Sequence, residues 1–320
     1  MESDGTQPSI EPKAIAANGI HPINLGALNT GNCRCNYEID RNFRRDINMF
    51  KIKADKENNI SKTLFECKRD NLTIRGAEYR PTGNNLPIAI VCHGFMAFQD
   101  TVKKYAIELA NMGYLAYTFD FCGGSVIKGK SDGLTTEMSV LTEVRDLESV
   151  IAYAASKKYA NRKNITIMGC SQGGFVSALA AAKEKYNINK LVLFYPALCI
   201  PDDANKGKML FAKFDPNNLP KIIRCGPMKL GKCYVEDVIK INPFEEIKNY
   251  QKDVLIVHGT KDKIVNINYA KKAYETYKNA IPSRNVRFES IENGRHGFSK
   301  KYDKIATEIL KDFMKLYDTL

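Results

Sequence analysis

The sequence predicts an α/β fold in which a mostly parallel central sheet carries helices on both faces. Short apolar runs alternate with longer amphipathic runs along most of the chain, a pattern that is typical of strands joined by crossover helices. Polar segments follow several apolar runs directly, at the carboxyl ends of strands where open α/β sheets carry their sites. A chain of 320 residues suits one large domain with an appended segment.

Residues 1–60 are expected to form an N-terminal extension that is partly disordered or lies along the domain. Most of this segment is rich in Gly, Asn, Pro, Ser and Ala and shows no periodicity. The main domain is then expected over residues 61–320. Its first strands are predicted at 63–67 and 72–79, and Asp70-Asn71 between them is a turn signal. These two strands should form an antiparallel hairpin at the edge of the sheet.

The later elements follow from apolar periodicity. Strands are predicted at 87–92, 115–121, 164–169, 190–196, 253–259 and 286–291, and helices at 101–112, 136–158, 172–185, 268–279 and 301–317. Between Leu198 and Ile247 the pattern breaks, and five prolines interrupt it. A long stretch without periodicity is usually functional, so we expect a small lid insertion at residues 199–246.

The most informative motif of the chain is Gly169-Cys170-Ser171-Gln172-Gly173. It follows an apolar strand and precedes a helical run of small residues, so the serine would lie at a sharp strand-to-helix turn. The two glycines leave room for such a turn. The amides at the start of the helix would favour negative charge that develops at the serine oxygen. Ser171 is therefore the candidate nucleophile.

A serine hydroxyl needs an adjacent base, and the base needs an orienting group. Two histidines follow Ser171 in the chain. His296 lies just after the last predicted strand and is the favoured base. The rival, His258, directly precedes Gly259, where a packed or backbone-bonded imidazole is the usual outcome. Asp262 lies in the loop after the preceding strand and is the candidate acid, and a turn-forming aspartate is the alternative.

Acyl transfer creates an oxyanion, which needs hydrogen-bond donors aimed at it in advance. The backbone N–H of Gln172, the residue after the nucleophile, is one candidate. The N–H of Phe95, in the loop after the strand at 87–92, is the other. We interpret His93 in the same loop as a histidine that braces the loop, because the base normally follows the nucleophile in this arrangement.

Five segments together resemble the α/β-hydrolase superfamily and, within it, bacterial feruloyl (cinnamoyl) esterases and related serine carboxylesterases. They are residues 93–95, 119–121 with 129–133, 169–174, 258–262 and 295–298, in the family's order. The resemblance covers residues 62–320. It implies an α/β-hydrolase catalytic domain that cleaves carboxylic esters, with hydroxycinnamoyl esters among its small-molecule substrates, through an acyl-enzyme intermediate and without a cofactor or metal.

The region from Phe214 to Asp237 resembles the insertion that these esterases carry over the active site. Tyr234 and Asp237 are candidates for substrate contact, and the alternative for Tyr234 is that it packs the insertion against the domain. Two features depart from the family: the loop at residues 122–129 is longer, and the N-terminal extension is additional. Both concern substrate specificity rather than the fold.

Other functions stay open. A peptidase, thioesterase or lipase would use the same fold, although such a peptidase usually carries a propeller domain. An inactive binding module is a further alternative, but every catalytic position is filled. Residues 124–131 match the P-loop pattern G-x-x-x-x-G-K-S of nucleotide-binding proteins. The turn signal Asp132-Gly133 follows where a P-loop would open a helix, which argues against that function.

Charge and cysteine content limit the partners. The net charge is +12, and the lysines are scattered along the predicted helices as on a solvated surface. Two explanations are open: a preference for acidic substrates, or a coding bias toward Lys, Asn and Ile. No basic patch interleaved with aromatic residues indicates nucleic acid. Nine cysteines without a paired metal-ligand pattern are typical of a reducing compartment. No signal peptide and no run of about 20 apolar residues is visible, so a cytoplasmic location without a membrane span is expected. Pairing of Cys225 with Cys233 and the oligomeric state are left open.

Overall fold

The computed structural model describes residues 60–127, 129–280 and 285–315. The described residues all belong to one compact unit of the chain. The expected N-terminal extension therefore lies almost entirely outside the described residues.

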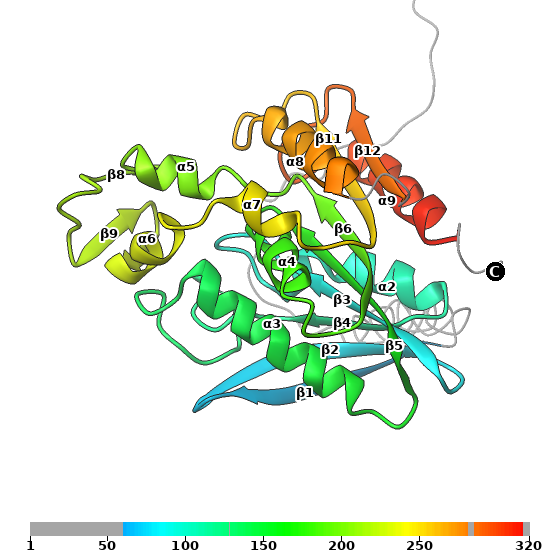
Figure 1. Ribbon diagram of the computed structural model, residues 1–320. Helices are drawn as coiled ribbons and strands as arrows, with labels where there is room; N and C mark the ends of the chain where they lie inside the picture. The colour runs from blue at the N-terminus through cyan, green and yellow to red at the C-terminus, as the bar shows by residue number, and fades with distance from the viewer. Residues whose placement is uncertain (1–59, 128, 281–284, 316–320) are drawn as a thin grey trace, which may run out of the picture. The chain divides into compact units, whose positions relative to one another are not determined.

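An eight-stranded sheet forms the centre of the described part of the chain (Figure 1). Its strands, in spatial order, are β1 (Ile60–Arg69), β2 (Leu72–Pro81), β4 (Leu115–Phe119), β3 (Leu86–Cys92), β5 (Ala160–Cys170), β6 (Ile188–Phe194), β11 (Asp253–Gly259) and β12 (Val286–Ile291). All pairs from β4 to β12 are parallel, whereas β2 pairs antiparallel with both β1 and β4. The predicted, mostly parallel sheet and its antiparallel edge hairpin are confirmed.

Helices cover both faces of this sheet. They are α2 (Lys103–Asn111), α3 (Val140–Ala155), α4 (Gln172–Ala182), α8 (Ile267–Ala280) and α9 (Lys300–Lys315), together with the short 3₁₀ helix η1 (Gln99–Thr101). Alternate strand residues point to opposite faces. Ile88 and Ile90 of β3 share a core with α3, α4 and α8, whereas Ala89 and Val91 share one with α2 and α9.

Helix α3 begins four residues later than the periodicity predicts. The Ser139 side chain accepts a hydrogen bond from the backbone N–H of Thr142, and the Thr142 hydroxyl accepts one from the N–H of Ser139. This reciprocal capping box satisfies two N–H groups that would otherwise lack partners. The helix therefore starts at Val140, and the residues before it form turns.

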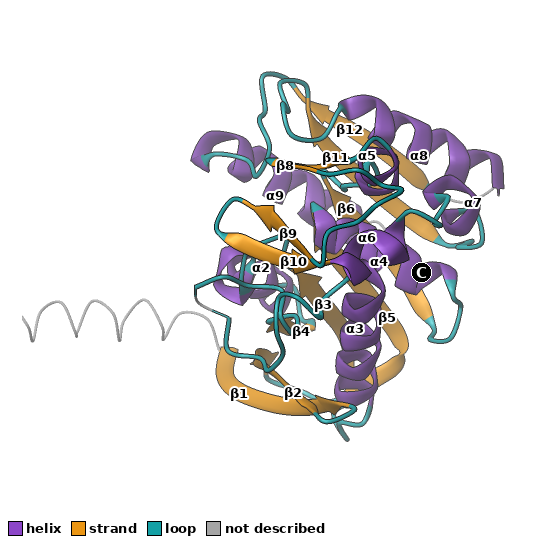
Figure 2. Cartoon of the chain, turned by 90° about the vertical axis from the view of Figure 1, so that its left-hand side faces the viewer, coloured by secondary structure: helices purple, strands orange, loops and turns teal. Residues whose placement is uncertain are grey.

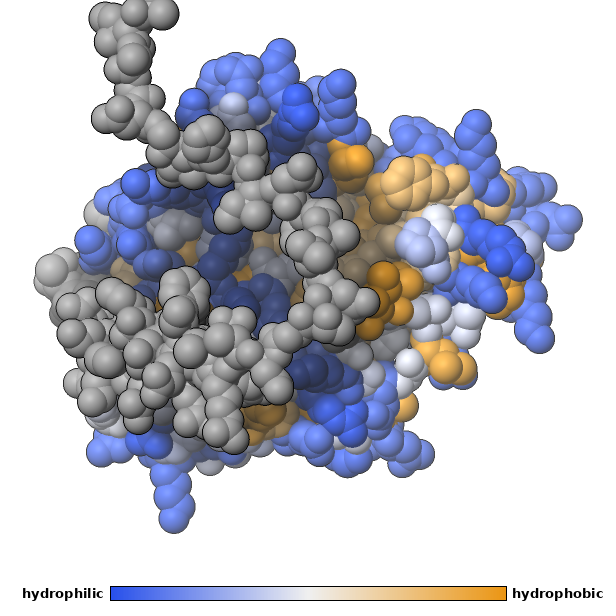
Figure 3. All heavy atoms as spheres, turned by 180° about the vertical axis from the view of Figure 1, so that it is seen from behind, coloured by the Kyte–Doolittle hydropathy of each residue, from blue (hydrophilic) through white to orange (hydrophobic). Residues whose placement is uncertain are grey.

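The insertion (residues 199–246) contains short regular elements, which the sequence did not predict. They are α5 (Ile200–Asn205), the hairpin of β7 (Lys208–Met209) and β8 (Ala212–Lys213), the hairpin of β9 (Ile222–Cys225) and β10 (Met228–Gly231), α6 (Lys232–Val238) and the start of α7 (Pro243–Ile247). Figure 2 shows the β9–β10 hairpin next to α6. Figure 3 shows hydrophobic atoms exposed among hydrophilic ones on the side of the molecule where the insertion lies. Cys225 and Cys233 are both free thiols.

Candidate active site

Ser171 lies at the sharp turn between the end of β5 and the start of α4. Its backbone has φ 54° and ψ −121°, a conformation that a residue with a side chain adopts only under strain. The neighbouring chain leaves no room for more atoms. A Cβ atom at Gly169 would lie 2.2 Å from the carbonyl oxygen of Gly173, and one at Gly173 would lie 2.3 Å from that of His93. The two glycines of the motif are thus needed for this turn.

Three side chains from different loops meet at this turn. His296 Nε2 lies 2.9 Å from Ser171 Oγ, and His296 Nδ1 lies 2.7 Å from Asp262 Oδ2. The other carboxylate oxygen of Asp262 accepts the backbone N–H groups of Ile264 and Val265 at 2.8 and 3.0 Å. Burial alone would raise the pKa of Asp262, but the hydrogen bonds from histidines and backbone outweigh it and hold the pKa below its ordinary value. Asp262 is therefore ionised beside the imidazole.

His258, the rival base, does not reach the serine. Its Nε2 lies 3.0 Å from the carbonyl oxygen of Val265 and 3.2 Å from Asp262 Oδ2, and its side chain is fully buried. The structure thus brings His296, and not His258, to Ser171. The backbone contact of His258 matches the expectation. Its contact with Asp262 was missed, although a spacing of four residues around one loop could have suggested it.

The two candidate oxyanion donors flank the serine. Phe95, Ser171 and Gln172 line the same cavity. A Cβ atom at Gly94 would lie 3.0 Å from Ser171 Cβ, so the loop that carries Phe95 passes close to the nucleophile. No described residue accepts a hydrogen bond from the backbone N–H of Phe95 or Gln172. Both amides are therefore available to a ligand oxygen at this position.

Comparison with known proteins assigns the fold. A model of the family described as "Serine aminopeptidase, S33" matches residues 84–237. The structure of Est1E from Butyrivibrio proteoclasticus with bound ferulic acid superimposes with a TM-score of 0.71, at 27% identity, over 78% of this chain and 97% of that chain. The chain has the α/β-hydrolase fold. It resembles the feruloyl esterases, as its motifs predicted.

A lipase and a further esterase also resemble this chain. The monoglyceride lipase of Rattus norvegicus is 27% identical over 186 residues, and the match spans 57% of this chain and only 56% of the relative. An esterase of Pyrococcus furiosus, Pf2001, shares the fold with a TM-score of 0.60, at 20% identity, over 81% of this chain and 94% of that chain. The proteins that resemble this chain thus include a lipase and an esterase.

The side chain of Gln172 is held by hydrogen bonds on two sides. Its Nε2 donates to Glu143 Oε2 at 2.8 Å, and its Oε1 accepts from the Tyr234 hydroxyl at 2.6 Å. All three side chains are buried. The Tyr234 ring also lies 6.1 Å from the ring of Phe95, centre to centre. Through Tyr234, the insertion thus contacts both residues whose N–H groups are the candidate oxyanion donors.

The position of Tyr234 matches the alternative that it packs the insertion against the domain, whereas that of Asp237 differs from the expected substrate contact. Neither residue lines the cavity beside Ser171. A fully buried phenol needs a hydrogen-bond partner, and Tyr234 finds it in Gln172. Asp237 accepts a hydrogen bond from the hydroxyl of Ser139 at the start of α3. The structure therefore gives both residues positions that join the insertion to the domain.

The buried carboxyl of Glu143 gives a testable pH dependence. Burial raises the pKa of Glu143 well above its ordinary value, against the opposing hydrogen bond from Gln172. Because the folded-state pKa exceeds the unfolded value of about 4.3, the stability linked to this group is complete below that pH and is lost as pH rises through the folded-state pKa. Relative to Glu143→Gln, the wild type should lose about 1 kcal/mol or more of unfolding free energy between pH 5 and alkaline pH. Urea unfolding of both proteins across pH measures the difference, and parallel curves would contradict it.

A cavity of about 210 Å³ adjoins Ser171 and His296. Its walls are mostly apolar and come largely from the insertion and from the loop after β11: Ala197, Cys199, Ile200, Met209, Leu210, Phe211, Ile264 and Val265. The single carboxylate that lines it belongs to Asp203, which pairs with Lys208 at 2.9 Å. The sequence did not single out Asp203, because only the fold of α5 places it at the cavity.

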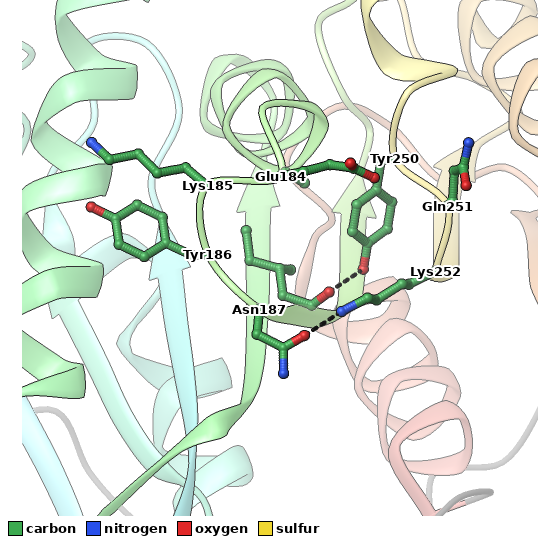
Figure 4. A pocket seen from close by; sticks show the side chains of 9 residues that line it. Glu184, Lys185, Tyr186, Asn187, Tyr250, Gln251 and Lys252 are labelled. Carbon is green, nitrogen blue, oxygen red and sulfur yellow. Dashed lines mark hydrogen bonds between the residues drawn. The ribbon is translucent and has the colours of Figure 1, made fainter.

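A larger cavity of about 310 Å³ lies away from the serine, at the start of β6 (Figure 4). Its polar groups largely bind one another. Lys252 donates to the amide oxygen of Asn187, and the Tyr250 hydroxyl donates to the carbonyl of Ile188 at 3.3 Å. Since the serine and the histidine lie at the opposite ends of the strands, we assign this cavity no part in their chemistry.

His93 braces its loop, as expected. Its Nδ1 lies 2.8 Å from the carbonyl oxygen of Gly94, and its Nε2 accepts the backbone N–H of Phe121 at 3.2 Å. Burial lowers the pKa of His93, which keeps the ring neutral. A neutral ring with a proton on Nδ1 satisfies both contacts, so His93 joins the loop that carries Phe95 to the segment after β4.

The P-loop pattern does not form a phosphate cradle. The Ser131 hydroxyl donates to the carbonyl of Asp120 and accepts the backbone N–H of Arg75 at 2.8 Å. The backbone N–H of Lys130 donates to Asp120 Oδ2 at 2.9 Å. No helix opens until Val140. The described part of the chain also holds no group of three or more His, Cys, Asp or Glu able to bind a metal ion, and none of its helices has the length and apolar character needed to cross a bilayer.

Proposed function

We propose that this α/β-hydrolase is a carboxylesterase that acts through an acyl-enzyme, with hydroxycinnamoyl esters such as feruloyl esters as its preferred substrates. The observation that carries the proposal is the continuous hydrogen-bonded chain from Ser171 Oγ through His296 to Asp262 Oδ2, at 2.9 and 2.7 Å. This chain ends at the mouth of an apolar cavity. Such an arrangement is what nucleophilic catalysis by serine requires.

The reaction proceeds in two steps. The Ser171 oxygen attacks the ester carbonyl while His296 Nε2 takes its proton, and Asp262 stabilises the imidazolium. The backbone N–H groups of Phe95 and Gln172 hold the oxyanion. As the intermediate collapses, the C–O bond to the alcohol breaks and His296 donates its proton to the leaving oxygen. A water molecule then repeats the attack and releases the acid.

The shape and polarity of the cavity support a hydroxycinnamoyl group. Its apolar walls suit a planar aromatic acyl group, and the carboxylate of Asp203 could accept a hydrogen bond from a phenolic hydroxyl. The structure of Est1E that resembles this chain holds ferulic acid. A peptidase would need contacts for an amine or a peptide, whereas the cavity offers one carboxylate that is already paired with Lys208.

Two measurements test the proposal in sequence. A fluorophosphonate probe should label the wild type and leave Ser171→Ala unlabelled, and a wild type that stays unlabelled would favour an inactive binding module. The value of kcat/KM should then be higher for methyl ferulate than for p-nitrophenyl acetate, a monoacylglycerol, an acyl thioester or an aminoacyl amide. A preference for one of the last three would assign a lipase, a thioesterase or a peptidase instead.

Asp203 offers a sharper test of the acyl group. In Asp203→Ala, the preference for methyl 4-hydroxycinnamate over methyl cinnamate should fall about tenfold, because a hydrogen bond to a charged group contributes about 1.5–3 kcal/mol. The matched control is Asp202→Ala. Asp202 accepts the hydroxyl of Tyr269 at 2.7 Å and does not line the cavity, so its loss should leave the preference unchanged. Equal effects of the two variants would contradict a phenol contact at Asp203.

A further inference from the structure

The insertion exposes an apolar hairpin tip beside the mouth of the catalytic cavity. Met209 pairs with Ala212, so Leu210 and Phe211 form the two-residue turn between β7 and β8. Leu210 is 42% exposed and Phe211 is 74% exposed, and both also line the cavity. Turns of this kind normally carry Gly, Asn or Asp. Two large apolar side chains are therefore partly exposed to solvent at a turn where small or polar residues are usual.

The backbone of this tip is also strained. Leu210 has φ 49°, in the left-handed region that glycine and asparagine adopt readily and that leucine avoids. Strain of this kind lowers stability and is found mainly at functional positions. Folding alone would be served better by a polar residue at position 210. The side chain of Leu210 thus indicates a role for the tip outside the protein's own core.

The insertion is strongly basic around this tip. Residues 206–232 contain seven Lys or Arg and one Asp, and all seven basic residues are exposed. In both hairpins, basic residues stand directly opposite each other: Lys208 pairs with Lys213, and Arg224 pairs with Lys229. Like charges at such positions destabilise a hairpin. Asp203 offsets the charge of Lys208, but the described residues contain no ion-pair partner for the other three.

The two hairpins lie against each other. A Cβ atom at Gly226, in the β9–β10 turn, would lie 3.4 Å from the Phe211 ring, so the ring lies over this turn. The apolar tip and the basic pairs therefore belong to one surface. Figure 3 shows hydrophobic atoms next to strongly hydrophilic ones on this side of the molecule.

We propose that this surface docks onto an anionic lipid surface. Leu210 and Phe211 would enter the apolar layer, while the basic side chains would lie at the level of the anionic headgroups. A polysaccharide or nucleic acid would be held by the basic residues alone and would leave the apolar tip without a partner. Because Leu210 and Phe211 line the cavity, docking brings its mouth to the lipid, from which an amphiphilic ester could enter. The proposal does not depend on the catalytic role of Ser171.

Vesicle sedimentation of the full chain tests this docking. The Ser171→Ala protein is used so that no lipid is hydrolysed, with vesicles of phosphatidylcholine alone or mixed with phosphatidylglycerol. Binding should be strong only to the anionic vesicles and should fall as salt is added. Phe211→Ser should weaken it roughly tenfold or more, from lost apolar burial. The double variant Lys213→Gln/Arg224→Gln should weaken it by a similar factor, from lost charge.

Matched controls lie outside the insertion. Ile305→Ser removes an apolar residue of α9 that is 42% exposed, and Lys271→Gln/Lys300→Gln removes two exposed charges. Both variants should bind vesicles as the parent does. Equal binding to neutral and anionic vesicles, no binding, or equal losses in test and control variants would overturn the proposal. Retention on polygalacturonate or DNA without vesicle binding would overturn it too and would assign a polyanion site.

Leu210→Asn separates docking from packing. Asparagine tolerates the positive φ, so this variant should melt at the same temperature as the parent or higher, while its vesicle binding falls. A variant that melts lower and still binds vesicles would show that Leu210 serves the fold, and the proposal would fail.

Discussion

Ser171→Ala should lower kcat on any accepted ester about 10⁶-fold, which corresponds to roughly 8 kcal/mol of activation free energy. The hydroxyl oxygen is the atom that we propose attacks the ester, and no other described hydroxyl lies against His296 Nε2. The free energy of unfolding should change by less than about 1 kcal/mol, because the lost hydrogen bond joins two partly exposed side chains. Steady-state kinetics with p-nitrophenyl acetate and urea unfolding measure the two quantities. An alanine variant that retains activity would exclude Ser171 as the nucleophile.

Ser171→Gly provides the matched comparison. It removes the same hydroxyl, so the activity should be equally low. It also removes the Cβ atom from a backbone with φ 54°, where glycine is unstrained. The free energy of unfolding should therefore be about 1 kcal/mol higher for the glycine variant than for the alanine variant. If both variants lose stability equally, the turn is less strained than its dihedral angles indicate.

The sheet and the three proposed catalytic residues could be predicted because their signals are local. Most parallel strands of the central sheet contain a short apolar run, and the parallel arrangement brings the carboxyl ends of these strands to one edge. Ser171 follows a strand directly, and Asp262 and His296 lie in the loops after two other strands, so their meeting could be expected without knowledge of packing. Gly169 and Gly173 likewise indicated a sharp turn from their positions next to Ser171 alone.

What the sequence did not predict depends on tertiary contacts. Strands of two to four residues, such as β7 and β9, are too short to show a period, so the insertion looked irregular. For Tyr234 the sequence left substrate contact and packing both open, because its partner could not be known, and only the folded chain pairs its hydroxyl with Gln172. The burial of Glu143 could not be predicted either, because a glutamate on an amphipathic helix is expected to be exposed unless its neighbours in the fold are known.

Asp262→Asn should lower kcat about 10⁴-fold while keeping the size of the side chain. The carboxylate accepts the Nδ1–H of His296, which leaves Nε2 free to take the serine proton. An asparagine that turns its NH₂ group to Nδ1 would favour the tautomer with hydrogen on Nε2, which cannot accept that proton. The variant should therefore fail in the chemical step, and its kcat should fall far more than its KM rises.

The same variant should also lose stability in a pH-dependent way. The pKa of Asp262 is depressed in the folded protein, so its contribution is complete above the unfolded value of about 3.9 and is lost as pH falls through the folded-state pKa. At neutral pH the free energy of unfolding should be about 2–3 kcal/mol lower for the variant than for the wild type, because a buried charge with several hydrogen bonds is removed. The difference should shrink below about pH 4.

His258 supplies the control for this argument. It contacts the same Asp262 oxygen but not Ser171, so His258→Gln should reduce stability while leaving most of the activity in place. If His258→Gln abolished activity and His296→Gln did not, the base would be His258, and the hydrogen-bonded chain through His296 would not be the catalytic one. Urea unfolding at a series of pH values, with kcat for each variant, decides between these outcomes.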